Sequence, residues 1–138
     1  MKNFTLFIIL LVTLASCSSD DIDDVDFTYE LMPISMANIP DTLTYGENSI
    51  ITLDYLRPST CHAFAGFNVI ENEQEITLSI LNTVVQNGSN CENLDNVTAS
   101  ENFEFLVERE DYYIFKIYEG IDEEGNEVYL TKEVMIQL

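Results

Sequence analysis

The chain has 138 residues, of which 25 are acidic and five are basic, so its formal net charge is −20. Nucleic-acid binding is excluded from the expected functions, because contacts with phosphate need lysine and arginine. The length allows a single small domain, and the charge leaves divalent cations, basic proteins and neutral ligands as classes of partner.

Residues 1–16 have the pattern of a secretory signal peptide. Lys2 supplies a positive charge near the start, and an almost unbroken apolar run follows from Phe4 to Ala15. About 12 residues of helix rise roughly 18 Å, which is less than the ~30 Å hydrocarbon core of a bilayer. The run is therefore too short for an ordinary transmembrane span, and we expect residues 1–16 to be removed.

The apolar run ends in Leu14-Ala15-Ser16-Cys17. This motif resembles the lipobox of bacterial lipoproteins, in which the cysteine thiol is acylated and the chain is cut just before it. The resemblance implies that Cys17 is the mature N-terminus and carries the lipid, a palmitate-type acyl anchor that holds the protein to a membrane. A buried cysteine beside a hydrophobic helix is the alternative interpretation.

Residues 17–26 form an acidic segment that contains five aspartates. Like charges at this density resist packing, which predicts a solvated tether. The first residues after the cysteine are Ser18-Ser19-Asp20-Asp21, similar to the surface-export signal of lipoproteins in Bacteroidetes-type bacteria. That resemblance implies an outer-membrane lipoprotein that faces the outside of the cell. A simple spacer is the alternative.

Residues 27–138 show apolar residues at a period of two, which predicts an all-β domain. We expect about seven antiparallel strands in a β-sandwich, with a small β-barrel as the alternative. Pro33 should interrupt the first strand, and Gly66 should mark a bulge. The expected strands lie in ranges 28–37, 49–56, 62–71 and 75–85, around Phe103 to Val107 and Tyr113 to Ile117, and in 128–138.

The last strands read FEFLVEREDYYIFKIYEG and EVYLTKEVMIQL. They resemble the E-F-G end of immunoglobulin-like domains, with Tyr113 at the place of the corner tyrosine. The resemblance implies an immunoglobulin-like sandwich. The chain contains no tryptophan, so the Cys-Trp-Cys core of true immunoglobulin domains is absent.

The chain contains three cysteines. Once Cys17 is assigned to lipid, Cys61 and Cys91 remain as one pair, and an exported protein is expected to oxidise them to a disulfide. A catalytic thiol is the alternative. His62, the only histidine, directly follows Cys61, and neighbours on a strand point to opposite faces, which argues against a Cys-His dyad. We interpret His62 as a strand-end residue that makes one hydrogen bond.

Tyr112, Tyr118 and Tyr129 are expected on the sheet face opposite Tyr113, near Lys116. Adjacent strands would join these tyrosines into an aromatic patch for a protein or glycan partner. Cross-strand tyrosines that only stabilise the sheet are the alternative.

Asp122, Glu124 and Asn126 alternate as ligands do in a calcium loop. Gly125 does not fall at the sixth position, so an EF-hand is excluded. A weak surface calcium site is an alternative to a solvated hairpin, and we expect no other metal and no cofactor.

These features predict a lipid-anchored, surface-exposed binding or accessory module that is not an enzyme, since no catalytic constellation is present. The alternative is an inhibitor or immunity-type protein for a basic enzyme, with charge steering the association. A cleft that gathers several carboxylates would reopen the possibility of an enzyme.

Overall fold

The computed structural model describes residues 26–86 and 90–138. These residues contain nine strands, and no helix in them is suited to cross a membrane. The strands are β1 (Phe27–Met32), β2 (Ile34–Asn38), β3 (Thr42–Thr44), β4 (Asn48–Leu56), β5 (His62–Asn72), β6 (Glu75–Val85), β7 (Thr98–Leu106), β8 (Tyr112–Ile121) and β9 (Glu127–Gln137).

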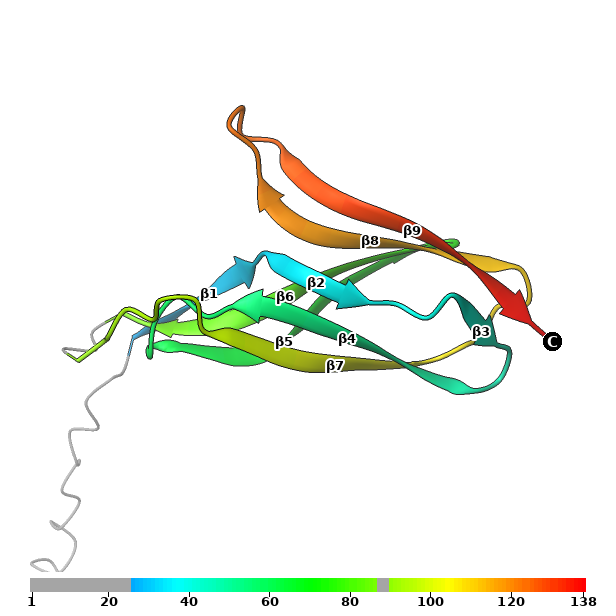
Figure 1. Ribbon diagram of the computed structural model, residues 1–138, viewed down its shortest axis with the longest axis horizontal. Coiled ribbons are helices and arrows are strands. Elements are labelled where there is room, and N and C mark those ends of the chain that lie inside the picture. The colour runs from blue at the N-terminus through cyan, green and yellow to red at the C-terminus, as the bar shows by residue number, and fades with distance from the viewer. Residues whose placement is uncertain (1–25, 87–89) are drawn as a thin grey trace, which may run out of the picture.

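The strands form two sheets that pack against each other (Figure 1). The larger sheet has six strands in the order β1-β6-β8-β9-β3, with β5 also paired to β6. The smaller sheet has the order β2-β4-β7. Neither sheet closes on itself, so the predicted two-sheet β-sandwich is confirmed and the small β-barrel is wrong.

The chain changes sheet at Pro33, between β1 and β2. β1 pairs with β6 in the larger sheet, and β2 pairs with β4 in the smaller one. Proline has no N–H to donate to a ladder, so the break falls where pairing is interrupted. Pro33 packs against Gly120, whose φ is +122°, and a Cβ at that glycine would lie 3.4 Å from Cγ of Pro33. Both the conformation and the close approach therefore favour glycine at residue 120.

The expected number of about seven strands is too low. The interruption at Pro33 is confirmed and separates β1 from β2, and β3 lies between the expected strands 28–37 and 49–56, where no strand was predicted. In addition, β3 pairs with β9 and β6 pairs with β8 in parallel, so the sandwich is not wholly antiparallel. Parallel neighbours need a crossover, and the chain makes one between β6 and β8 by passing through β7 of the other sheet.

The bulge predicted at Gly66 is confirmed. The register between β5 and β6 shifts between Phe64 and Gly66. After the shift, Phe67 and Val69 pack against the core. The extra residue thus lets Phe67 and Val69 face the core, while Phe64, before the bulge, remains 38 % exposed.

The core lies between the sheets, as the alternation of apolar residues predicted. β4, β6 and β8 contribute most of the fully buried side chains, each at most 6 % exposed: Ile51, Leu53, Tyr55, Ile76, Leu78, Ile80, Tyr113, Phe115 and Ile117. A row of aromatic contacts joins the sheets, with Phe67 and Phe103 at a ring-centroid distance of 5.4 Å.

Candidate functional site

The predicted lipid and export residues, Cys17, Ser18, Ser19, Asp20 and Asp21, lie outside the described residues.

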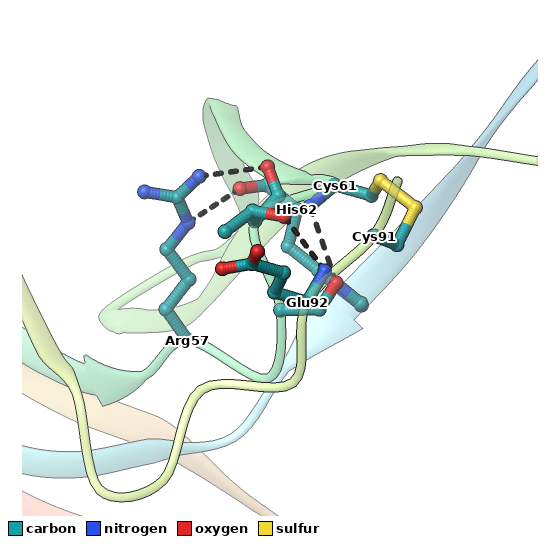
Figure 2. The surroundings of a disulfide bond; sticks show 7 residues. Arg57, Cys61, His62, Cys91 and Glu92 are labelled. Carbon is teal, nitrogen blue, oxygen red and sulfur yellow. Dashed lines mark hydrogen bonds between the residues drawn. A yellow bond between two sulfur atoms is a disulfide. The ribbon is translucent and has the colours of Figure 1, made fainter. Parts of the chain in front are cut away.

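Cys61 and Cys91 form a disulfide, as predicted, with a Cα–Cα distance of 5.3 Å (Figure 2). The bond joins the residue before β5 to the segment between β6 and β7. The carbonyl oxygen of Cys61 accepts a hydrogen bond from the backbone N–H of Val85 at 3.2 Å. The N–H of Gln86 donates to the carbonyl of Asp26 at 2.8 Å. The disulfide therefore lies at the same end of the sandwich as the start of β1.

Hydrogen bonds also hold the segment around Cys91 to the turn before β5. The N–H of Thr60 donates to the carbonyl of Glu92, and the N–H of Glu92 donates to Oγ1 of Thr60, both at 3.0 Å. The N–H of Leu94 donates to the carbonyl of Pro58 at 2.9 Å. The two segments are thus paired through the backbone as well as through sulfur.

Arg57 braces the same turn from the other side (Figure 2). Its Nε donates to the carbonyl of His62 at 2.6 Å, and a terminal guanidinium nitrogen donates to the carbonyl of Thr60 at 3.0 Å. Charged donors make strong hydrogen bonds, so Arg57 fixes the geometry of the disulfide turn.

His62 makes two side-chain contacts, and the interpretation with one hydrogen bond is wrong. Nδ1 lies 2.8 Å from Oγ of Ser59, and Nε2 lies 3.3 Å from Oε2 of Glu30. Oγ of Ser59 accepts from the N–H of Cys61 at 3.2 Å. Which ring nitrogen of His62 donates and which accepts depends on the tautomer of the imidazole.

A serine, a histidine and a carboxylate are the residue types of acyl-transfer triads. Here the serine belongs to a turn in which the N–H of His62 donates to the carbonyl of Ser59 at 3.2 Å. Ser59 is only 7 % exposed, and its hydroxyl is engaged by Cys61 and His62. These hydrogen bonds explain why Ser59, His62 and Glu30 lie together: the three side chains form a polar cap at this end of the sandwich. Sequence inspection missed Glu30 in this group because it lies 32 residues before His62.

The predicted tyrosine patch is assembled only in part. Tyr118 and Tyr129 are opposite each other in β8 and β9, with ring centroids 5.8 Å apart. Tyr112 precedes Tyr118 by six residues on the same strand, which separates them by about 20 Å. Tyr112 therefore lies away from the Tyr118–Tyr129 pair, opposite Met135 in the register of β8 with β9. Tyr118 is also 7 % exposed, which leaves little of its ring available to a partner.

Polar contacts surround the remaining tyrosine pair. Nζ of Lys116 lies 5.0 Å from the ring centroid of Tyr129 and 3.3 Å from a carboxylate oxygen of Glu75. The hydroxyl of Tyr129 donates to Glu127 at 2.6 Å, and this hydrogen bond raises the pKa of Tyr129 to about 12. Contacts with the charged side chains of Lys116 and Glu127 therefore hold the tyrosine pair in place on the sheet.

Asp122 organises the hairpin between β8 and β9. Its Oδ1 accepts from the N–H of Glu124 at 2.9 Å and from the N–H of Asn126 at 2.8 Å. These hydrogen bonds lower the pKa of Asp122, with the backbone contact of Asn126 as the largest cause. Within the two described ranges, no group of three or more histidine, cysteine, aspartate or glutamate side chains is arranged to hold a metal ion.

A hollow of about 450 Å³ opens at the end of the sandwich remote from the disulfide. It lies between the β5–β6 turn and the connection from β7 to β8. Exposed glutamates stand on both sides of it: Glu71 and Glu73 on one, and Glu108 on the other. Less exposed residues, Ile76, Phe105 and Tyr113, form its inner wall. We call this feature the distal hollow.

Arg109 also lines the distal hollow, but its charge is already paired. Its guanidinium contacts both carboxylate oxygens of Asp111, at 2.9 and 2.8 Å. This interaction lowers the pKa of Asp111 to about 2 and raises that of Arg109. Among the described residues, Glu71, Glu73 and Glu108 make no ion pair with Arg109 or any other cation.

One polar side chain in the core is poorly satisfied. Asn82 is fully buried, and neither its amide nitrogen nor its oxygen makes a hydrogen bond of ordinary geometry within the described chain. The Tyr55 hydroxyl is its neighbour; burial raises the pKa of Tyr55, and the Asn82 side chain acts in the opposite direction. Burial of an amide without good hydrogen bonds costs free energy, and the contact with the Tyr55 hydroxyl offsets part of that cost.

The fold and these sites define a disulfide-braced, acidic, two-sheet β-sandwich. Comparison of the chain with protein-family models, with curated proteins and with solved structures finds no match.

Proposed function

We propose that this protein is a lipid-anchored binding or accessory module displayed on the outer membrane, without catalytic activity. The observation that carries the proposal is the motif Leu14-Ala15-Ser16-Cys17 at the end of a short apolar segment. The disulfide between Cys61 and Cys91 supports it, because stable disulfides are expected in exported proteins.

We further infer that the domain is a variant of the immunoglobulin-like sandwich. In immunoglobulin-like domains, strand E lies in one sheet and strands F and G lie in the other. Here β7, in the place of strand E, lies in the smaller sheet, and the hairpin β8–β9, in the place of F and G, lies in the larger one. The hydroxyl of Tyr113 accepts a hydrogen bond from the N–H of Glu108 at 3.1 Å, which is the contact expected of a corner tyrosine. The parallel pairing of β6 with β8 departs from the antiparallel sheets of that fold.

Lipidation at Cys17 would orient the domain. Residues 18–26 span at most about 30 Å when fully extended. The start of β1 and the disulfide share one end of the sandwich, which would then lie nearer the membrane. β5 has 11 residues and separates that end from the distal hollow by roughly 35 Å. The distal hollow would therefore point away from the membrane.

Replacement of Cys17 by alanine tests the anchor. We expect Cys17→Ala to abolish incorporation of labelled acyl chains and to release the protein from the membrane fraction, because no other residue of the motif carries a thiol. The matched control is Ser18→Ala, which should keep the label and remain with membranes. Undiminished labelling of Cys17→Ala would rule out the lipoprotein assignment.

The acidic tether is tested by replacing Asp20, Asp21, Asp23 and Asp24 with alanine. If these acids direct export, the variant should be lipidated but protected from protease added to intact cells, while the wild type is digested. A control that removes four exposed acids from the domain instead, Glu104, Glu110, Glu123 and Glu124, should be digested like the wild type. Equal digestion of the tether variant and the wild type would leave only the spacer interpretation.

The second candidate function is inhibition of, or immunity against, a basic enzyme. The net charge of −20 favours it, and so do the glutamates of the distal hollow, which make no ion pair within residues 26–86 and 90–138. Association with a basic enzyme should weaken steeply as salt is raised, because long-range steering is screened. Binding that is insensitive to salt would favour the accessory module.

A further inference from the structure

We infer that the surface of the lipid bilayer covers one end of the outer face of the larger sheet in the anchored protein. The contact surface consists of six residues of β1 and β6, beside the point at which the described chain begins: Phe27, Tyr29, Leu31, Leu81, Thr83 and Val85. We call this surface the β1 patch. The inference rests on the proposed lipid anchor at Cys17 and adds the surface by which the folded domain meets the membrane.

The side chains of β1 alternate in the reverse of the expected sense. A sheet that packs on a core with one face is expected to carry polar side chains on its other face. In β1 the outward positions are Phe27, Tyr29 and Leu31, which are 55 %, 61 % and 38 % exposed. Glu30, between them, faces the other side of the sheet, where it contacts Nε2 of His62. The core of the sandwich therefore does not account for these three apolar residues.

The register of β1 with β6 places the β1 patch on the outer face. Residues directly opposite each other in an antiparallel pair share a face. The pairs are Phe27 with Val85, Tyr29 with Thr83 and Leu31 with Leu81. The β6 residues of the patch alternate with Ile80 and Asn82, which are buried between the sheets. The rings of Phe27 and Tyr29 also contact each other edge to face, with centroids 5.8 Å apart. The patch is therefore one continuous exposed surface.

The β1 patch contains no charged residue, although 25 of the 138 residues of the chain are acidic. A basic protein would find no carboxylate to pair with on this surface. A second copy of the chain would bring its own net charge of −20 and be repelled by the first. A lipid surface without net charge gains from the apolar contact and meets no such repulsion, so it is the occupant that the charge distribution favours.

The proposed anchor lies close to the β1 patch along the chain. Residues 18–26 separate Cys17 from Phe27 and span at most about 30 Å. A lipid on Cys17 would therefore make contact between the patch and the bilayer an intramolecular step, which needs much less affinity than recruitment from solution. Aromatic side chains are suited to the region between water and hydrocarbon, and a tyrosine hydroxyl there stays hydrated.

The test exploits the absence of tryptophan from the chain. The reporter variant is Tyr29→Trp, and its match is Tyr45→Trp, at a residue 46 % exposed between β3 and β4. Each variant is purified with its lipid and reconstituted into phosphatidylcholine vesicles whose acyl chains are either plain or brominated. Bromine in the acyl chains quenches tryptophan fluorescence only on close approach.

Brominated vesicles should quench the Tyr29→Trp variant, and its emission should lie further to the blue than that of Tyr45→Trp, which should not be quenched. Equal quenching of both variants would mean that the domain has no preferred face and would overturn the inference. Absence of quenching in Tyr29→Trp would also overturn it. A blue-shifted but unquenched Tyr29→Trp variant would show that protein covers the patch instead of lipid.

A charge placed in the β1 patch should release it from the bilayer. Phe27→Asp is combined with Tyr29→Trp, and the matched change is Ile50→Asp, because Ile50 is 52 % exposed on β4 of the other sheet. Burial of a half-exposed phenylalanine ring favours the docked state about tenfold. Phe27→Asp should therefore lose most of the quenching, and Ile50→Asp should retain it. Undiminished quenching in Phe27→Asp, with both variants folded by circular dichroism, would contradict the inference.

The anchor and the β1 patch fail in different measurements. If acyl chains label the protein but Tyr29→Trp is not quenched, the lipoprotein assignment stands and the patch does not contact lipid. If labelling is absent, the proposed anchor fails. The chain from Cys17 onward is then coupled through that thiol to a maleimide-bearing phospholipid, since Cys61 and Cys91 are joined in the disulfide. The same quenching measurement decides whether the patch enters the bilayer.

Discussion

Replacement of both Cys61 and Cys91 by serine should lower the free energy of unfolding by about 3.5 kcal/mol. The bond closes a loop whose ends are 30 residues apart, and most of its expected effect is a restriction of the unfolded chain. The corresponding fall in midpoint temperature is roughly 15 °C for a domain of this size. Urea unfolding followed by circular dichroism measures the change.

The native state should survive the loss of the disulfide. The backbone hydrogen bonds between the Thr60 and Glu92 segments, and the guanidinium of Arg57 on the carbonyl of His62, do not involve sulfur. The wild type treated with reductant is the control and should unfold at the same urea concentration as the double serine variant. Coincident unfolding of the oxidised wild type and the double variant would contradict this prediction, as would two free thiols on alkylation of the native protein.

Truncation of Phe115 to alanine should cost about 3–5 kcal/mol of stability. The side chain is fully buried, and its ring lies 5.7 Å from that of Phe105 and 5.8 Å from that of Tyr113 between ring centroids. Truncation would leave a cavity directly behind Phe105 and Tyr113, two residues that line the distal hollow.

Tyr112→Ala is the matched control for Phe115→Ala. It removes an aromatic ring from the opposite face of the same strand, where the residue is only partly buried. We expect its cost to stay below about 1 kcal/mol, since surface substitutions have small effects. Similar losses for both variants in urea unfolding would contradict the assignment of Phe115 to the core.

Much of the strand plan was predictable because it depends on local patterns. Alternation in β4, β6 and β8 placed their buried residues, and Pro33 and Gly66 marked a break and a bulge from the chemistry of their backbones. β3 was missed because three residues, Thr42–Thr44, are too short to show a period. β7 begins at Thr98, earlier than predicted, since the polar residues that precede Phe103 resemble a loop.

The candidate sites were less predictable because they join residues that are distant in the chain. The parallel pairing of β6 with β8 brings Glu75 next to Ile114 and sets the salt bridge from Lys116 to Glu75. The cap of Ser59, His62 and Glu30 and the glutamates of the distal hollow likewise come from separate strands and turns. No periodicity within one segment encodes such neighbours.

Local alternation in the sequence was enough to predict that the domain is built from strands and which side chains of β4, β6 and β8 face inward. The pair of Cys61 and Cys91 was predicted by setting Cys17 aside as the expected lipid site, and the structure contains that disulfide. Only the tertiary structure decided the strand order, the separation of Tyr112 from Tyr118 and Tyr129, and the position of the distal hollow. The physical reason is that strand order depends on where crossovers return the chain, and that choice is made by packing between residues far apart in sequence.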